Sequence, residues 1–116
     1  MKTDSLIQGL WIDFYPNGKV NIISFYKDNI LEGPFEVYHK NGILAYKRYF
    51  IDGMSQGELS DYYENGNLRS KSFFRNDTIH GIYIRYDEEG EIEYKAEYDM
   101  GKIIRTYVEN PLILSR

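Results

Sequence analysis

Apolar and polar residues alternate along this chain in short stretches, and the same stretch returns at a fixed interval. Glycines mark the interval: one series recurs every 24 residues, and a second series follows it at the same spacing. The first series is Gly9, Gly33, Gly57 and Gly81, and the second is Gly18, Gly42, Gly66 and Gly90. A fixed period of this length is typical of repeat proteins, in which each unit packs against its neighbours. The sequence therefore predicts a single domain over residues 1–116, with repeats at about 9–32, 33–56, 57–80 and 81–104 and a C-terminal cap at 105–116.

Each repeat has the pattern of two β-strands and two tight turns. Counting the opening glycine as position 0, positions 1–7 and 10–18 alternate as strands do. Asn-Gly, typical of a two-residue type I′ hairpin turn, joins these strands at residues 17–18, 41–42 and 65–66, and Glu-Gly replaces it at 89–90. A second turn follows at positions 19 and 20, with residues that tolerate positive φ. Its four copies are Asp28-Asn29, Asp52-Gly53, Asn76-Asp77 and Met100-Gly101.

These elements predict an all-β fold: a single-layer, curved antiparallel meander of about eight strands, with no helix of more than two turns before residue 105. The opening glycine lies in the middle of a strand, which predicts a crease that curls the sheet. At the ends of the chain, Ile7 has the position of Leu31 and Ile79, so the first eight residues resemble the tail of a preceding repeat. Pro111 is expected to stop the last strand, and residues 112–114 to cap the sheet.

Two-residue turns would fix which side chains share a face of the sheet. Position 2 would lie opposite position 15, position 4 opposite 13, position 6 opposite 11, and position 17 opposite 22. We expect Phe35, Leu44 and Phe50 to be well buried on the face that these positions define, called the first face below. Its predicted bulky residues are Trp11, Phe35, Leu59 and Tyr83 at position 2; Val20, Leu44, Leu68 and Ile92 at position 11; Tyr26, Phe50, Phe74 and Tyr98 at position 17; and Leu31, Ile79 and Ile103 at position 22.

The other side of the sheet, called the second face below, combines charged residues with aromatic rows. Lys47, Lys71 and Lys95 at position 14 are expected to be exposed there. The aromatic rows are Phe14, Tyr38, Tyr62 and Tyr86 at position 5, and Phe25, Tyr49 and Phe73 at position 16. A face that only meets water does not require such rows, and tyrosine is favoured at protein interfaces.

Composition and charge narrow the classes of function. The chain has no cysteine, which excludes disulfides, thiolate chemistry and cysteine-based zinc sites. Its net charge of -4 disfavours general nucleic-acid binding, which requires a basic surface, and favours a basic partner. No stretch is apolar enough for a signal peptide or a membrane span, so the chain as given is expected to be cytoplasmic.

Candidate catalytic groups are few. His39 stands where other repeats have Tyr15, Tyr63 and Asp87, which indicates a hairpin surface residue. His80 precedes an opening glycine, like Gln8, Glu32 and Gln56. Because no catalytic triad, phosphate-binding glycine loop or metal-ligand spacing is present, the sequence predicts no enzyme activity, no cofactor and no metal site.

The most uneven charge lies between Asp87 and Asp99, where seven carboxylates accompany one lysine. The stretch lacks the ligand spacing of a calcium loop. Two interpretations remain: a solvated hairpin tip, or a charged turn that steers a basic partner.

The repeated pattern Gly-x-aromatic-x-x-aromatic-aromatic-x-Asn-Gly, with its second turn, resembles the MORN repeat over about residues 7–107. It is most similar to the bacterial MORN-variant repeats of antitoxin and immunity proteins. This resemblance implies a curved sheet of stacked hairpins and a protein that protects its producer by binding a toxin. Two departures are that Trp11 is the only tryptophan of the pattern and that Glu89 replaces asparagine.

Residues and resemblance together predict an immunity protein or antitoxin that binds a cognate toxin with a basic surface. Its predicted contacts are Tyr38, Tyr62, Tyr86, Asp87, Glu88, Glu89 and Glu91. The alternative is a structural or scaffolding MORN-repeat module without a toxin partner. A hydrolase is disfavoured because paired catalytic groups are absent.

Overall fold

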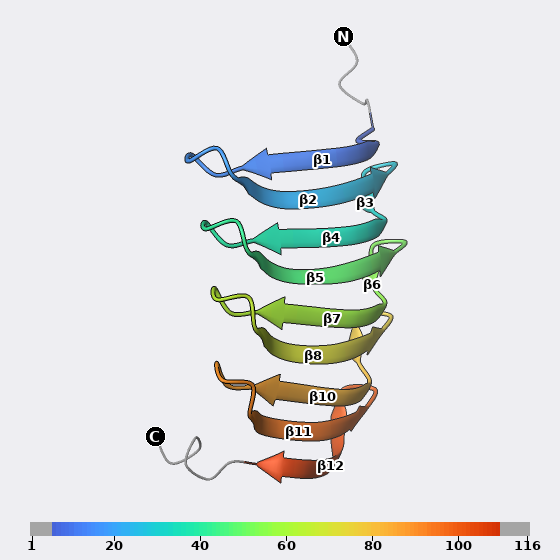
Figure 1. Cartoon of the computed structure of the whole chain (residues 1–116). Coiled ribbons are helices and arrows are strands. Elements are labelled where there is room, and N and C mark those ends of the chain that lie inside the picture. The colour runs from blue at the N-terminus through green and yellow to red at the C-terminus, as the bar shows by residue number, and fades with distance from the viewer. Residues whose placement is uncertain (1–5, 110–116) are drawn as a thin grey trace.

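A computed structural model describes residues 6–109 as one open antiparallel sheet of twelve strands (Figure 1). The molecule measures 59 × 35 × 19 Å. Nine strands follow one another across the sheet in chain order, and three two-residue strands, β3, β6 and β9, pair beside them. The nine are β1 (Gly9–Phe14), β2 (Val20–Lys27), β4 (Gly33–Tyr38), β5 (Leu44–Ile51), β7 (Gly57–Tyr62), β8 (Leu68–Arg75), β10 (Gly81–Tyr86), β11 (Ile92–Asp99) and β12 (Lys102–Glu109), and the three are β3 (Ile30–Leu31), β6 (Met54–Ser55) and β9 (Thr78–Ile79).

The prediction of an all-β antiparallel single sheet built from four hairpin repeats is confirmed, but the expected count of about eight strands was too low. The added short strands lie just before the opening glycines, where the chain still pairs with the previous strand. Residues 105–109, the start of the predicted cap, belong to β12, a full strand paired with β11. The predicted roles of Pro111 and residues 112–114 lie outside the described residues.

The Asn-Gly hairpins are present, but the predicted two-residue type I′ turn is wrong. In the second repeat the backbone N–H of Gly42 donates to the carbonyl of His39 (2.9 Å), and the N–H of His39 donates to Ile43 (2.8 Å). These bonds enclose a three-residue loop that ends in a left-handed glycine, with φ of 93° at Gly42 and no positive φ at Asn41. The other three hairpins form the same pair of bonds.

Type I′ geometry occurs instead at the second turn of each repeat. Both central residues have positive φ, for example 51° at Asp28 and 71° at Asn29. Tyr26 pairs with Leu31 across this turn, which confirms the predicted pairing of position 17 with position 22. The mainly Asp, Asn and Gly residues found there are those that adopt positive φ with least strain.

An irregularity near each hairpin tip changes the predicted faces. Phe35 pairs with Arg48 and Val37 with Tyr46, as expected, but Tyr38 then pairs with Leu44 because a bulge inserts one extra residue. Position 11 therefore lies beside position 5 on the second face, not on the first. The residue at position 12 moves to the first face instead, where Arg69 contacts Asp61 (2.9 Å). All four hairpins contain this shift.

The chain bends at the opening glycine of each repeat. Between the pairs Leu31–Tyr26 and Glu36–Ile23, the segment that leads from β3 into β4 contains two residues more than the part of β2 that it faces. Gly33 lies in this excess with φ of 95°, a conformation that residues with a Cβ rarely adopt. The strands are visibly curved in Figure 1, as the predicted crease requires.

Only a thin core forms, because a single layer has no second layer to cover it. On the first face Phe50 is buried and packs edge-on against Phe35, with 5.7 Å between ring centroids. Small residues opposite the bulky position 2 are also buried: Ser24, Ser72 and Ala96.

The expectation that the first-face residues are buried and the second-face lysines exposed is only partly correct. Phe35 and Leu44 are half-buried, and of the three lysines only Lys47 is exposed. Lys71 lies 3.9 Å from Glu58, and the Lys95 ammonium lies 5.3 Å from the Tyr107 ring. Neighbouring side chains on the second face therefore cover these two lysines in part.

The requirement for a left-handed glycine in each hairpin loop can be tested at Gly66. This residue has φ of 93° and no neighbouring atom within 4 Å of an added Cβ. Because space is available, Gly66→Val should lose stability through backbone strain alone, on the order of 1 kcal/mol or more. Gly66→Asn should lose less, since asparagine tolerates positive φ. Equal denaturation midpoints for both variants and the wild type would contradict this assignment.

Phe50 tests where the packing energy lies. Phe50→Ala should destabilise the protein by about 3 kcal/mol, the lower end for removing a buried aromatic ring, because one side of the sheet is open. Phe14→Ala, at a ring that is 60% exposed, is the matched control and should change the unfolding free energy little. A loss at Phe14 equal to that at Phe50 in urea titrations would show that the faces are wrongly assigned.

Candidate functional site

The second face carries several large exposed apolar side chains of the hairpins. Phe14 is 60% exposed, Leu10 54% and Tyr49 47%, and Ile12 and Phe73 are also exposed. These five residues occupy positions 1, 3, 5 and 16, whose side chains point to the same side of the sheet. Exposed apolar side chains that share one face are a feature of protein interaction sites.

Sequence reasoning identified the aromatic rows of this face but missed Leu10 and Ile12. The sequence did contain a signal for an apolar patch there: Ile23 stands at position 14, where the other three repeats have lysine. Leu10 pairs with Phe25, and Ile12 pairs with Ile23. The middle of the second face is therefore apolar in the first repeat and charged in the others.

The predicted contacts Tyr38, Tyr62 and Tyr86 form a row near the hairpin tips, one per repeat, and all three are half-buried. The bulge places apolar partners beside them, at Leu44, Leu68 and Ile92. The Tyr38 hydroxyl donates to Glu36 (3.0 Å). Burial raises the pKa of the Tyr38 phenol, and Glu36 raises it further. These rings thus form a partly covered band rather than free anchors, with Phe14 at its most exposed end.

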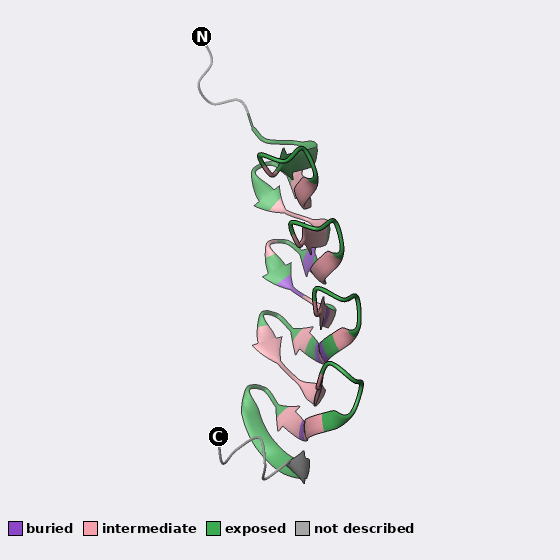
Figure 2. Ribbon diagram, turned by 60° about the vertical axis from the view of Figure 1, so that its left-hand side comes forward, coloured by how far each residue is buried: buried purple, intermediate pink, exposed green. Residues whose placement is uncertain are grey.

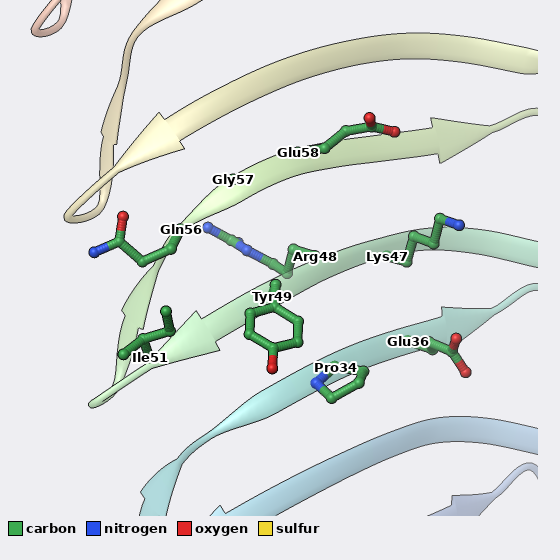
Figure 3. A pocket seen from close by; sticks show the side chains of 9 residues that line it. All are labelled: Pro34, Glu36, Lys47, Arg48, Tyr49, Ile51, Gln56, Gly57 and Glu58. Carbon is green, nitrogen blue, oxygen red and sulfur yellow. The ribbon is translucent and has the colours of Figure 1, made fainter.

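An open groove of about 640 Å³ lies beside this band on the second face (Figure 3). Tyr49 and Pro34, which pair across β4 and β5, provide its apolar surface. Glu36, Lys47 and Glu58 provide its charged rim. An apolar surface with a charged rim is suited to holding a side chain that is apolar or long and basic.

The acidic hairpin is exposed at Glu88, Glu89 and Glu91. Asp87 has a different place: its carboxylate accepts the backbone N–H groups of Glu89 and Glu91, both at 2.9 Å. Asp87 therefore holds the loop in shape, and the other three carboxylates face solvent.

Charge changes sign along the edge formed by the four hairpin tips. Lys19 and Lys40 occupy the first two tips, and Glu64 precedes the acidic fourth tip. All three side chains are exposed. A partner that approaches this edge meets a basic half and an acidic half.

His39 links two repeats. Its Nε2 donates to the backbone carbonyl of Tyr62 (2.9 Å), which places the ring proton on Nε2. Tyr15 and Tyr63 stand at the same position of their repeats, and their hydroxyls donate to the carbonyls of Tyr38 and Tyr86. His39 therefore performs the structural role of these tyrosines.

Asparagines of the hairpin loops also link repeats. The Asn17 side chain donates to the carbonyl of Lys40 (3.0 Å), and Asn41 donates to Glu64 (2.9 Å). Each also accepts a backbone N–H within its own loop. The fourth hairpin has no following hairpin to bond within residues 6–109, and its loop has Glu89 in place of asparagine.

His80 belongs to a second series of links, at the opposite edge. The backbone N–H of Met100 donates to its Nδ1 (3.2 Å). The side chains of Gln8, Glu32 and Gln56 accept the equivalent N–H groups of Asp28, Asp52 and Asn76. The bond at Gln8 agrees with the prediction that the first residues resemble the tail of a repeat.

The first face carries a polar cluster between the third and fourth repeats. Asp61 accepts hydrogen bonds from Arg69 and Ser70, and Arg85 pairs with Glu93 (3.1 Å). Burial raises the pKa of the neighbouring Tyr63, and Glu93 adds to the effect. The charges neutralise one another, and no three potential metal ligands gather within residues 6–109. Nor does that part of the chain contain a helix long and apolar enough to cross a membrane.

The linking role of His39 predicts a selective response to substitution. His39→Phe removes the bond to Tyr62 and should lower the unfolding free energy by about 1 kcal/mol. His39→Tyr, the matched control, should restore the bond in the form that Tyr15 and Tyr63 use. If both variants unfold at the same denaturant concentration, the hydrogen bond contributes nothing.

Comparison with known proteins agrees with the repeat frame. The family described as MORN repeat variant matches residues 7–28, 31–52, 55–76 and 79–100, one match per hairpin. No protein of curated function matches. A solved structure, the crystal structure of accessory secretory protein 1, 2 and 3 in Streptococcus pneumoniae, is similar with a TM-score of 0.45 and 14% identity. That match covers 94% of this chain and 20% of the other, and similarity at this level says nothing about function. With four matched units over most of its length, the chain belongs to the MORN repeat variant family.

Proposed function

We propose that this protein is an immunity protein or antitoxin, which neutralises a cognate bacterial toxin by binding to it. The observation that supports this proposal most is the second face, on which large apolar side chains are exposed. The assignment to toxin neutralisation rests on the resemblance of the repeats to those of antitoxin and immunity proteins.

The shape of the molecule suits contact with a protein surface. A stable interface covers roughly 800 Å² on each partner. The two longer dimensions, 59 and 35 Å, span a larger area than this. The extended backbone pairing and the links between repeats hold the backbone in place, so binding requires little ordering of the backbone.

The second face offers anchors of the types that dominate binding energy. Phe14, Tyr49 and Phe73 are exposed, and the half-buried tyrosines continue the row that begins with Phe14. Aromatic rings provide large contact area with few rotatable bonds. The groove beside Tyr49 adds a recess into which a partner side chain fits.

Charge favours a basic partner. The net charge is -4, and Glu88, Glu89 and Glu91 project from one hairpin tip. Such a tip raises the rate of encounter with a basic surface and contributes less to the lifetime of the complex.

A scaffolding module is the second candidate. It is favoured by the open ends of the sheet, where β1 and β12 each pair on one side within residues 6–109. A pull-down against the product of the adjacent gene separates the two candidates, because only an antitoxin is expected to capture that product.

Binding kinetics with that product test the predicted contacts. Glu88→Lys combined with Glu91→Lys should slow association and weaken its salt dependence, because steering by charge is lost. Tyr62→Ala or Tyr86→Ala should mainly raise the dissociation rate, since these rings act in the formed complex.

The matched control is Lys19→Glu with Lys40→Glu, at the other end of the hairpin edge, which should not slow association with a basic partner. Circular dichroism and the thermal midpoint establish that each variant is folded. Unchanged rates across the set would place the contact on the first face or at the sheet ends.

A further inference from the structure

The strand at the N-terminal end of the sheet, β1, is an apolar edge. Within residues 6–109 it pairs only with β2, and all six of its residues are exposed (Figure 2). Leu10 and Ile12 lie on the second face and Trp11 on the first, with exposed fractions of 39% or more. The strand contains no lysine, arginine or proline. A long apolar edge without these residues favours pairing with another strand.

The other end of the sheet is protected. The pairing of β12 with β11 has two register shifts, and bulges of this kind turn an edge away from a second strand. Lys102 and Arg105 place charges on β12. The Tyr107 ring is flanked by the Arg105 guanidinium at 5.7 Å and the Lys95 ammonium at 5.3 Å. The β12 end therefore carries more of the features that prevent association than the β1 end, where the pairing with β2 shifts once and Asp13 is the single charge.

The order of the strands restricts which partner strand fits. All neighbouring strands of the sheet are antiparallel, and the path across it has nine strands including both ends, so β1 and β12 run in the same direction. Stacking two copies head to tail with each face on the same side would require a parallel pair. Two β1 strands related by a two-fold axis instead continue the antiparallel alternation and keep each face on its own side.

The side chains of β1 favour the same arrangement. Asp13 is its only charged residue and lies near its C-terminal end. A parallel pair of β1 strands would place two Asp13 carboxylates side by side, whereas an antiparallel pair separates them to opposite ends. On the second face, Leu10, Ile12 and Phe14 of both copies would then form one apolar surface.

We propose that β1 pairs antiparallel with β1 of a second copy, forming a two-fold dimer with one continuous sheet. This inference does not rest on the proposed function, and it leaves the hairpin edge and the groove beside Tyr49 free. Because one edge strand per copy buries less than a standard interface, the dimer is expected to depend on protein concentration.

Sedimentation equilibrium of the full chain over a wide concentration range tests the dimer. The wild type should move from 13.8 kDa towards twice that mass as concentration rises. Ile12→Lys places like charges near the two-fold axis and should keep the protein monomeric over the whole range. The matched control is Ile104→Lys on β12, at a side chain that is 57% exposed, which should dimerise like the wild type.

Hydrogen exchange distinguishes strand pairing from face-to-face contact. Amides of residues 9–14 should gain protection as concentration rises, because pairing gives the outward N–H groups of β1 partners. A wild type that stays monomeric, a dimer that survives Ile12→Lys, or a dimer lost only in Ile104→Lys would each overturn the proposal. So would a dimer whose β1 amides exchange as fast as those of the monomer. Equal thermal midpoints of the two lysine variants exclude unfolding as the cause.

Discussion

Hydrogen bonds from side chains of one repeat to the backbone of the next hold this single-layer sheet in its shape. At the hairpin edge, position 6 bonds the following repeat through Tyr15, His39 and Tyr63. At the other edge, Gln8, Glu32, Gln56 and His80 accept backbone N–H groups 20 residues further along the chain. A sheet with few fully buried apolar residues gains little from a hydrophobic core, so these links and the strand pairing carry an unusually large share of its order.

The need to form these hydrogen bonds at every repeat also explains the two kinds of turn. The bend at each opening glycine and the left-handed glycine of each hairpin loop keep successive hairpins in one orientation, so that the links recur at each repeat. Positions within this frame are restricted by geometry, whereas positions 1, 3, 14 and 16 of the second face are free to differ. They do differ: Ile12 and Ile23 stand where the next repeat has Glu36 and Lys47. A repeat scaffold whose second face differs from repeat to repeat presents different chemistry along its length, which suits the binding function proposed above.

Open ends are the cost of an unclosed sheet. The two ends differ in chemistry, since β12 is charged and irregular and β1 is apolar and regular over most of its length. Because the strand number along the sheet is odd, the two ends are not complementary to each other. Closure by like ends limits assembly to pairs, whereas complementary ends would allow filaments to grow.

By itself the sequence determined the repeat frame, the antiparallel hairpins and the pairing of Phe35 with Arg48, because glycine spacing and two-residue alternation follow directly from backbone geometry. It also placed the aromatic rows that include Phe14 and Tyr49. Only the tertiary structure decided which turn is type I′, since Asn-Gly fits both a two-residue turn and a loop whose asparagine bonds the next repeat. It also decided that Leu44 lies on the second face, because one bulged residue reverses every side chain beyond it and leaves no mark in the alternation. The structural roles of His39, His80 and Asp87 depend on carbonyl and N–H groups brought near by the fold, which a residue's own position in the chain does not reveal.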